Sequence, residues 1–279
     1  MKCKVLYIFL FCVFSVSAQD YLRDRSLEPF SKLIVSDSYM VKYMKSDDFR
    51  VVIDTADNEI QQRTITQVVS DTLIIKYDGG KLAPVAIRLY APFLTDIDIS
   101  ETARFSTDEQ FSTERLNISL RGAGSIRFDN TLECDSVVAS LSGAGSMTFS
   151  SVYAKLTAFT VSGTVSCSVN GDVYTDGFVA EINGAGKMLF NESVKASGRV
   201  ALTVNGTASI EAKKLITAYR IIENIEGAGY IKTPLVEADR CDATLHGIGS
   251  ITLGGTVNYF SKELIGIGII NTKKLVIKK

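Results

Sequence analysis

Leu120-Arg-Gly-Ala-Gly-Ser-Ile126 is the first of eight copies of a glycine-centred motif that decides the fold. The copies recur every 19 to 22 residues as far as Ile270, and each reads apolar–x–Gly–x–small–x–apolar. Their first glycines are Gly122, Gly143, Gly163, Gly184, Gly206, Gly227, Gly247 and Gly266. A period near 21 residues indicates one supersecondary unit stacked on itself.

The residues on both sides of the first glycine alternate in character. The position two before it is apolar in all eight copies, and the position three before it is polar in all eight. After it, the fourth position is apolar and the fifth is mostly polar. An alternation of period two on both sides predicts two strands joined at a corner, where glycine permits positive φ or a close backbone approach.

The rest of each repeat predicts a third short strand, with Val137, Phe178 and Val200 among the residues that point inward. Three short strands in about 20 residues, without a helical period, predict an all-β chain built as a single-stranded parallel β-helix, or solenoid. Helical solenoids have longer periods, and a propeller blade needs about 40 residues. The motif does not predict a phosphate-binding loop, because the helix that such a loop requires does not follow.

Residues 27–110 are also rich in strand-forming segments but lack the glycine motif. The segment 97–105 lies one period before the first copy and has Glu101 where the glycine is expected, so we interpret it as a degenerate turn. A stack of strands needs its ends protected from edge pairing. We therefore expect an N-terminal β-rich capping region over residues 19–110, continuous with glycine-cornered repeats over residues 111–279.

Residues 1–18 have the pattern of a cleaved signal peptide: Lys2 and Lys4, an apolar run, then small residues before Gln19. Export predicts a place in the periplasm, at the cell surface or outside the cell. No later segment is apolar enough to cross a membrane, so no integral membrane segment is expected after cleavage. With 30 basic and 31 acidic residues, the chain is not expected to bind nucleic acid.

Three cysteines follow the signal segment: Cys134, Cys167 and Cys241. They occupy different repeat positions in turns that are not adjacent, beyond the reach of a disulfide. We predict that all three are free and buried.

The chain resembles the autotransporter-adhesin head domain, the GIN domain or DUF2807, a family of exported bacterial proteins. The resemblance rests on the signal segment, Pro29-Phe-Ser-Lys-Leu-Ile-Val35, the strand Thr72–Ile75, the link Pro92–Ser100 and the repeated glycine turns. It implies a right-handed parallel β-helix at the cell envelope with a role in adhesion or polysaccharide binding. It implies no catalytic residues. The family name suggests an autotransporter, but these residues give no sign of the C-terminal barrel that one requires.

Catalytic or metal-binding residues are not predicted. The one histidine, His246, lies in an outward column without an aspartate or cysteine arranged around it. Asp135 and Asp176 share a column, but Lys155 occupies that column in the turn between them. We therefore expect no enzyme activity, no metal and no cofactor.

Two outward columns are candidate ligand-binding sites. Tyr153 and Tyr174 share one column in adjacent turns, so their rings should lie one strand spacing apart and could contact a sugar or stabilise the stack. Arg199, Arg220 and Arg240 share another in three consecutive turns. Like charges so close need acids or an anion between them, and Glu223 and Asp239 are the expected acidic partners.

We therefore predict an exported, non-enzymatic β-helix that binds a polysaccharide or cell-surface glycan. A β-helix polysaccharide lyase or hydrolase and a structural envelope spacer remain alternatives. The sequence leaves the ligand, the compartment and the oligomeric state open.

Overall fold

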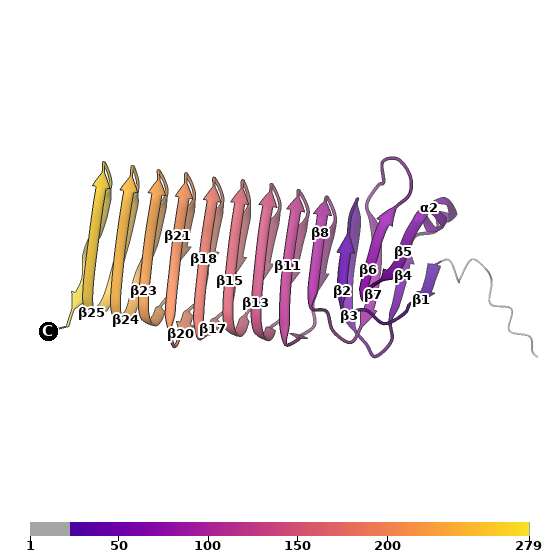
Figure 1. Cartoon of the computed structure of the whole chain (residues 1–279), viewed down its shortest axis with the longest axis horizontal. Helices are drawn as coiled ribbons and strands as arrows, with labels where there is room; N and C mark the ends of the chain where they lie inside the picture. The colour runs from indigo at the N-terminus through magenta and orange to yellow at the C-terminus, as the bar shows by residue number, and fades with distance from the viewer. Residues whose placement is uncertain (1–22, 279) are drawn as a thin grey trace, which may run out of the picture.

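The computed structural model describes residues 23–278, so the predicted signal segment lies outside the described residues. These residues form a β-solenoid of about nine turns, with antiparallel strands at its N-terminal end. Figure 1 shows the strands side by side along the length of the stack, from β25 at one end to β1 at the other. The all-β solenoid predicted from the glycine repeat is confirmed.

In each turn one strand runs up to the corner, where it ends at the first glycine or, in β8, at Glu101. These strands are β8 (Asp96–Glu101), β11 (Arg115–Gly122), β13 (Leu132–Gly143), β15 (Val152–Gly163), β18 (Gly177–Gly184), β21 (Arg199–Gly206), β23 (Ile216–Gly227), β24 (Tyr230–Gly247) and β25 (Ser250–Gly266). They pair in parallel, and every first glycine lies beside the first glycine of the next turn.

A second strand follows the corner. These strands are β9 (Arg104–Thr107), β12 (Ser125–Phe128), β14 (Ser146–Phe149), β16 (Ser166–Val169), β19 (Lys187–Phe190), β22 (Ser209–Ala212) and β26 (Ile269–Ile277). A separate third strand exists only as β10 (Phe111–Ser112), β17 (Val173–Thr175) and β20 (Val194–Ala196). In the other repeats it is continuous with the strand that leads to the glycine. Gly198 lies in the break after β20, and Gly177 directly follows the break after β17 as the first residue of β18; glycine weakens a strand at such positions.

The corner requires glycine for both of the reasons expected. Gly143 has φ 106°, and a Cβ atom on it would lie 2.6 Å from the carbonyl oxygen of Gly122 in the preceding turn. The degenerate turn predicted at 97–105 is also confirmed, because Glu101 pairs with Gly122 and has φ 58°.

The core is a column of inward side chains along the stack. Phenylalanines in successive turns contact each other, and the rings of Phe128 and Phe149 lie 5.4 Å apart and nearly parallel. Phe159 belongs to another inward column, on β15, and its ring lies 5.1 Å from that of Phe149. The repeating inward columns therefore give one continuous hydrophobic core.

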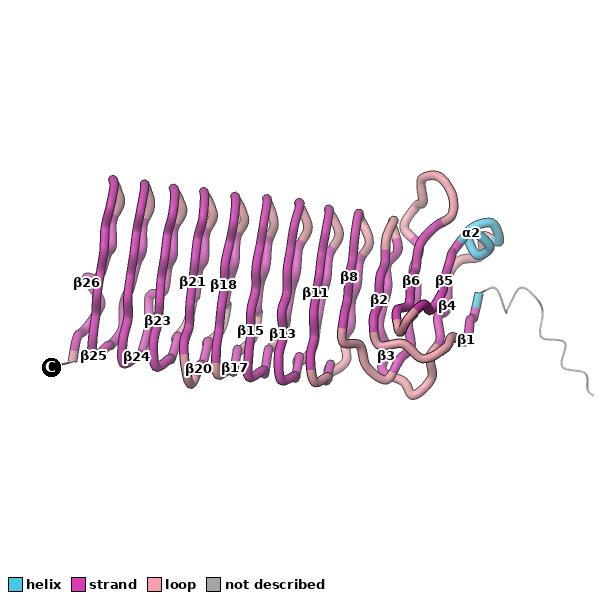
Figure 2. The backbone as a smooth tube through the Cα atoms, viewed as in Figure 1, coloured by secondary structure: helices cyan, strands magenta, loops and turns pink. Residues whose placement is uncertain are grey.

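The N-terminal strands are stacked in a different order from the chain. They are β1 (Asp24–Ser26), β2 (Lys32–Val35), β3 (Tyr39–Lys45), β4 (Arg50–Asp54), β5 (Thr64–Val69), β6 (Thr72–Tyr77) and β7 (Val85–Ala91), with helix α2 (Asn58–Arg63) before β5. β2 lies between β6 and β8, and β3 lies between β7 and β9, all in parallel. β5 and β4 then pair antiparallel with β6 and β7, and α2 lies beyond them (Figure 2). Residues before 111 thus contribute turns as well as end strands; the division at residue 110 stays a prediction.

Candidate functional site

The tyrosine ladder, Tyr153 and Tyr174, is formed as expected. The strands β15 and β17 place the two residues in register, and their rings stack with centroids 4.7 Å apart at 14°. The Nζ atom of Lys195, in the next turn, lies 4.5 Å from the centroid of Tyr174 and donates a hydrogen bond to its hydroxyl at 2.7 Å. That hydrogen bond is the largest cause of a raised pKa of Lys195.

These contacts change what the ladder can bind. The ring of Tyr174 has Tyr153 and Lys195 as neighbours, so a sugar cannot stack on it without displacing one of them. Tyr153 is 41% exposed. An open hollow of about 460 Å³ adjoins Tyr174 and Lys195 and is also lined by Lys155, Asp176 and Ser197. Of the ladder, Tyr174 alone lines this hollow, beside the charged groups of Lys155, Asp176 and Lys195.

The arginine ladder, Arg199, Arg220 and Arg240, is also in register, but its acidic partner is not one of those expected. Arg220 and Arg240 both pair with Asp242, at 2.8 Å and 3.1 Å. The expected partners were wrong. Asp239 accepts a hydrogen bond from Asn258, and Glu223 points into the core. Within the described part of the chain Arg199 has no ion pair.

Glu223 is fully buried, and Thr233 donates a hydrogen bond to its Oε1 atom at 2.6 Å. Its other oxygen has no hydrogen-bond partner among residues 23–278. Burial raises the pKa of this carboxyl to about 8. The sequence contained a signal for this burial, because Glu223 aligns with Ala180, Leu202 and Ala243 in an inward column. The expectation that Glu223 pairs with the arginines overlooked that column.

The residues considered for catalysis do not converge. Lys155 pairs with Asp135 at 2.8 Å, and Asp176 accepts a hydrogen bond from Ser197. His246 is partly exposed, with its Nε2 atom 3.7 Å from Glu263. Within residues 23–278, no three His, Cys, Asp or Glu side chains are grouped as metal ligands, and no helix is long and apolar enough to cross a membrane.

The three cysteines are free, as predicted. Cys167 and Cys241 are buried, whereas Cys134 is only partly buried, so the prediction of burial is wrong for that residue. Burial raises the pKa of the Cys134 and Cys167 thiols to about 12. Thiols with such high pKa values remain protonated and unreactive near neutral pH.

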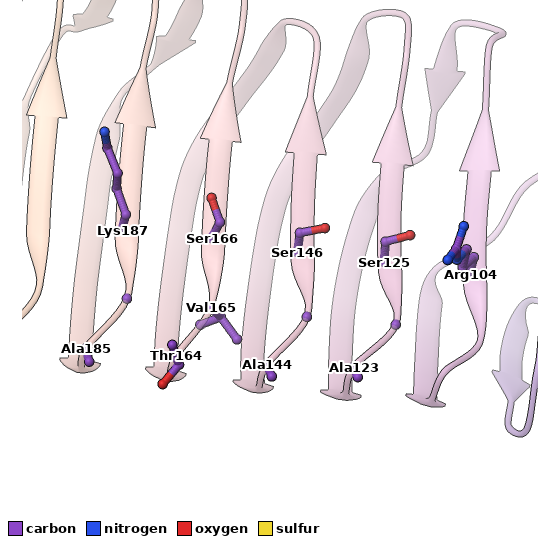
Figure 3. Close-up of a pocket in the computed structure, with 13 residues that line it drawn as sticks. Arg104, Ala123, Ser125, Ala144, Ser146, Thr164, Val165, Ser166, Ala185 and Lys187 are labelled. Carbon is purple, nitrogen blue, oxygen red and sulfur yellow. The ribbon is translucent and has the colours of Figure 1, made fainter.

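A groove of about 630 Å³ lies beside the glycine corner. Ser125, Ser146 and Ser166 form a row along it, with Arg104 at one end and Lys187 at the other (Figure 3). We call these five residues the serine groove. The parallel pairs put one of them in each of five successive turns, so the row is about 19 Å long at the usual strand spacing.

The polar groups of the serine groove are available to a ligand. Within the described chain the three serine hydroxyls form no hydrogen bond, and Arg104 forms no ion pair. The Nζ atom of Lys187 lies 3.8 Å from Glu211, which pairs more closely with Lys232 at 3.0 Å. No acidic side chain lines the groove. The repeated serine three residues after the glycine was visible in the sequence, but its position between two cations was not.

The fold, the two ladders and the serine groove define a class of protein. It is a glycine-cornered β-solenoid with rows of hydroxyl, aromatic and charged side chains on its outer surface. A family model described as "Putative auto-transporter adhesin, head GIN domain" matches residues 29–201 and 194–279. The chain belongs to this family, DUF2807, as its motifs indicated. None of the curated proteins compared matches the sequence.

Several solved structures share the fold. One from Parabacteroides distasonis, described as a "Putative lipid binding protein", has 17% identity and a TM-score of 0.67, covering 90% of this chain and 96% of its own. A "putative adhesin" from the same species has 16% identity and a TM-score of 0.64, covering 91% and 95%. Another from Bacteroides fragilis has 16% identity and a TM-score of 0.57, covering 86% and 95%. At these identities the likeness concerns the fold alone.

Proposed function

We propose that this chain is an exported, non-enzymatic adhesion module whose serine groove binds an extended acidic polysaccharide. The proposal rests on one observation: a row of three hydroxyls that form no hydrogen bond within the described chain, in a groove lined by no acidic side chain, has a cation at each end. Hydroxyl groups exchange hydrogen bonds with sugars, and Arg104 and Lys187 would pair with carboxylate or sulfate groups of the ligand.

The groove suits binding better than catalysis. Hydrolysis of glycosides uses a pair of carboxylates on either side of the bond, and the lining of the groove supplies none. The family description as an adhesin and the signal-like residues 1–18 agree with a binding role outside the cytoplasm.

A glycan array with neutral and acidic polysaccharides tests the proposal. We expect the wild type to bind acidic chains, with binding weakened at least tenfold in Arg104→Gln/Lys187→Gln and further weakened at high salt. Arg127→Gln/Lys213→Gln is the control, because it removes the same charge from other exposed positions. Both variants should give the same circular dichroism spectrum as the wild type.

Other outcomes would assign the function differently. If binding is lost in Tyr153→Ala/Tyr174→Ala but kept in the groove variant, the ligand lies at the tyrosine ladder. Loss in Arg199→Gln/Arg220→Gln alone would place it at the arginine ladder. If the wild type binds no glycan, the proposal fails and a spacer role is favoured.

A further inference from the structure

The serine groove carries charge only at its two ends. Arg104 and Lys187 are the two charged residues of its lining, and the three turns between them contribute Ser125, Ser146 and Ser166. The rest of the lining consists of glycine, alanine, threonine and valine residues. An anionic group of a ligand in the groove therefore finds an ion-pair partner only at one end or the other.

The distance between the two cations is set by the register of the stack. All five residues of the serine groove lie three positions after the corner residue of their turn, which is Glu101 before Arg104 and a first glycine in the other four turns. Each is paired with its neighbour in the next turn, so the five form one row across parallel strands (Figure 3). The Cα atoms of Arg104 and Lys187 are thus four strand spacings apart, about 19 Å.

The neighbouring turns add no third cation to this row. Met40 precedes Arg104 in the row and Ser209 follows Lys187. Three cations of the outward column two residues farther along are each paired with an acidic side chain: Lys42 with Asp108 at 2.9 Å, Arg127 with Asp129 at 2.7 Å, and Lys232 with Glu211 at 3.0 Å. The groove therefore offers two anion-binding positions at a single separation.

An extended polysaccharide can match this row turn by turn. One sugar of a cellulose-type chain has nearly the length of one strand spacing, about 4.8 Å, so a chain along the groove places roughly one sugar on each turn. The hydroxyls of neutral sugars exchange hydrogen bonds with the serine hydroxyls. A carboxylate on a middle sugar would lose water on entering the groove without gaining an ion pair, which weakens binding.

We propose that the serine groove recognises the spacing of charges: it binds a polysaccharide in which two acidic sugars are separated by three neutral ones. One acidic group pairs with Arg104, whose planar guanidinium can hold it through two hydrogen bonds, and the other pairs with Lys187. The neutral sugars lie on the three serines. This inference rests on the proposed function and adds that one chain engages both cations at once, so affinity depends on the distance between its charges.

Cello-oligosaccharides of three to seven sugars, each with a carboxylate on its first and last sugar, test the spacing. We expect calorimetry to give the tightest binding for the five-sugar compound, at least fivefold tighter than for the three-sugar and seven-sugar compounds. A five-sugar compound with a carboxylate on every sugar should bind no more tightly than the one with two, because the additional groups meet no cation in the groove.

An exchange of two residues in the row moves one cation without changing the composition. Ser166 and Lys187 are paired in adjacent turns, and both are exposed. Ser166→Lys/Lys187→Ser brings the two cations one strand spacing closer, so the tightest binding should shift from five sugars to four. Lys187→Ser alone is the control: it removes the second anchor, so binding should be weaker and should no longer depend on length. Both variants should keep the circular dichroism spectrum of the wild type.

The results distinguish failure of this inference from failure of the proposed function. If the wild type binds acidic polysaccharides but shows no preferred length in the series, recognition of spacing is wrong and the proposed function stands. Recognition of spacing is also wrong if the exchange variant still prefers five sugars. If the wild type binds neither the series nor any acidic polysaccharide, both fail.

Discussion

Glu223 is a carboxyl in a column of small and apolar residues, and its protonation is coupled to folding. The pKa of this group is raised by burial to about 8, compared with about 4.5 in an unfolded chain. Below pH 4.5 both states hold the proton and its stabilising effect is complete. Between pH 4.5 and 8 only the folded state keeps the proton, so stability falls as the pH rises.

We therefore expect the free energy of unfolding to contain a contribution that falls by up to about 1.4 kcal/mol per pH unit between pH 4.5 and 8. Glu223→Gln cannot ionise and keeps an acceptor for Thr233, so its stability should lack this contribution. Urea unfolding of both proteins at pH 5, 6.5 and 8 measures the difference. Equal pH dependence in the two proteins would show that Glu223 is not protonated in the folded state.

At the scale of a strand, the inward and outward faces should differ sharply in their effect on stability. Phe149 in β14 is fully buried between Phe128 and Phe159, so Phe149→Ala should lower the free energy of unfolding by about 3–5 kcal/mol. Tyr153→Ala removes an outward ring from the following strand and should cost about 1 kcal/mol. Urea midpoints compare the two. Similar losses would mean that the tyrosine ladder supports the stack as much as the core does.

The elements differ in how far the sequence could predict them. The corner positions, the inward columns and the two ladders follow from the repeat, because parallel stacking brings equivalent residues of successive turns into contact. The choice of Asp242 over Asp239 and Glu223 as the partner of the arginines depends on which face each side chain occupies. The serine groove joins a repeated serine to Arg104, which lies in the degenerate turn, so the glycine motif alone did not indicate it.

At the scale of the whole molecule, a stack of equivalent turns should tolerate the loss of one. Deleting residues 164–184 joins Gly163 to Ala185 and keeps every later column in register, because Gly163 and Gly184 are paired. This variant should fold with a β-rich circular dichroism spectrum and a cooperative urea transition. Deleting residues 164–174, about half a turn, should prevent folding, because it moves the corner glycine away from its partner. Folding of both variants would contradict a strict register.

The crossed order of the N-terminal turns has a consequence for folding as the chain is made. Residues of β2 and β3 pair with residues about 64 positions later in β8 and β9, whereas the repeats pair with neighbours about 21 positions away. Pairings of greater sequence separation close larger loops and form more slowly. The strands β2 and β3 therefore complete their pairing only after β8 and β9 have been made, whereas each glycine repeat can pair as soon as the next repeat is complete.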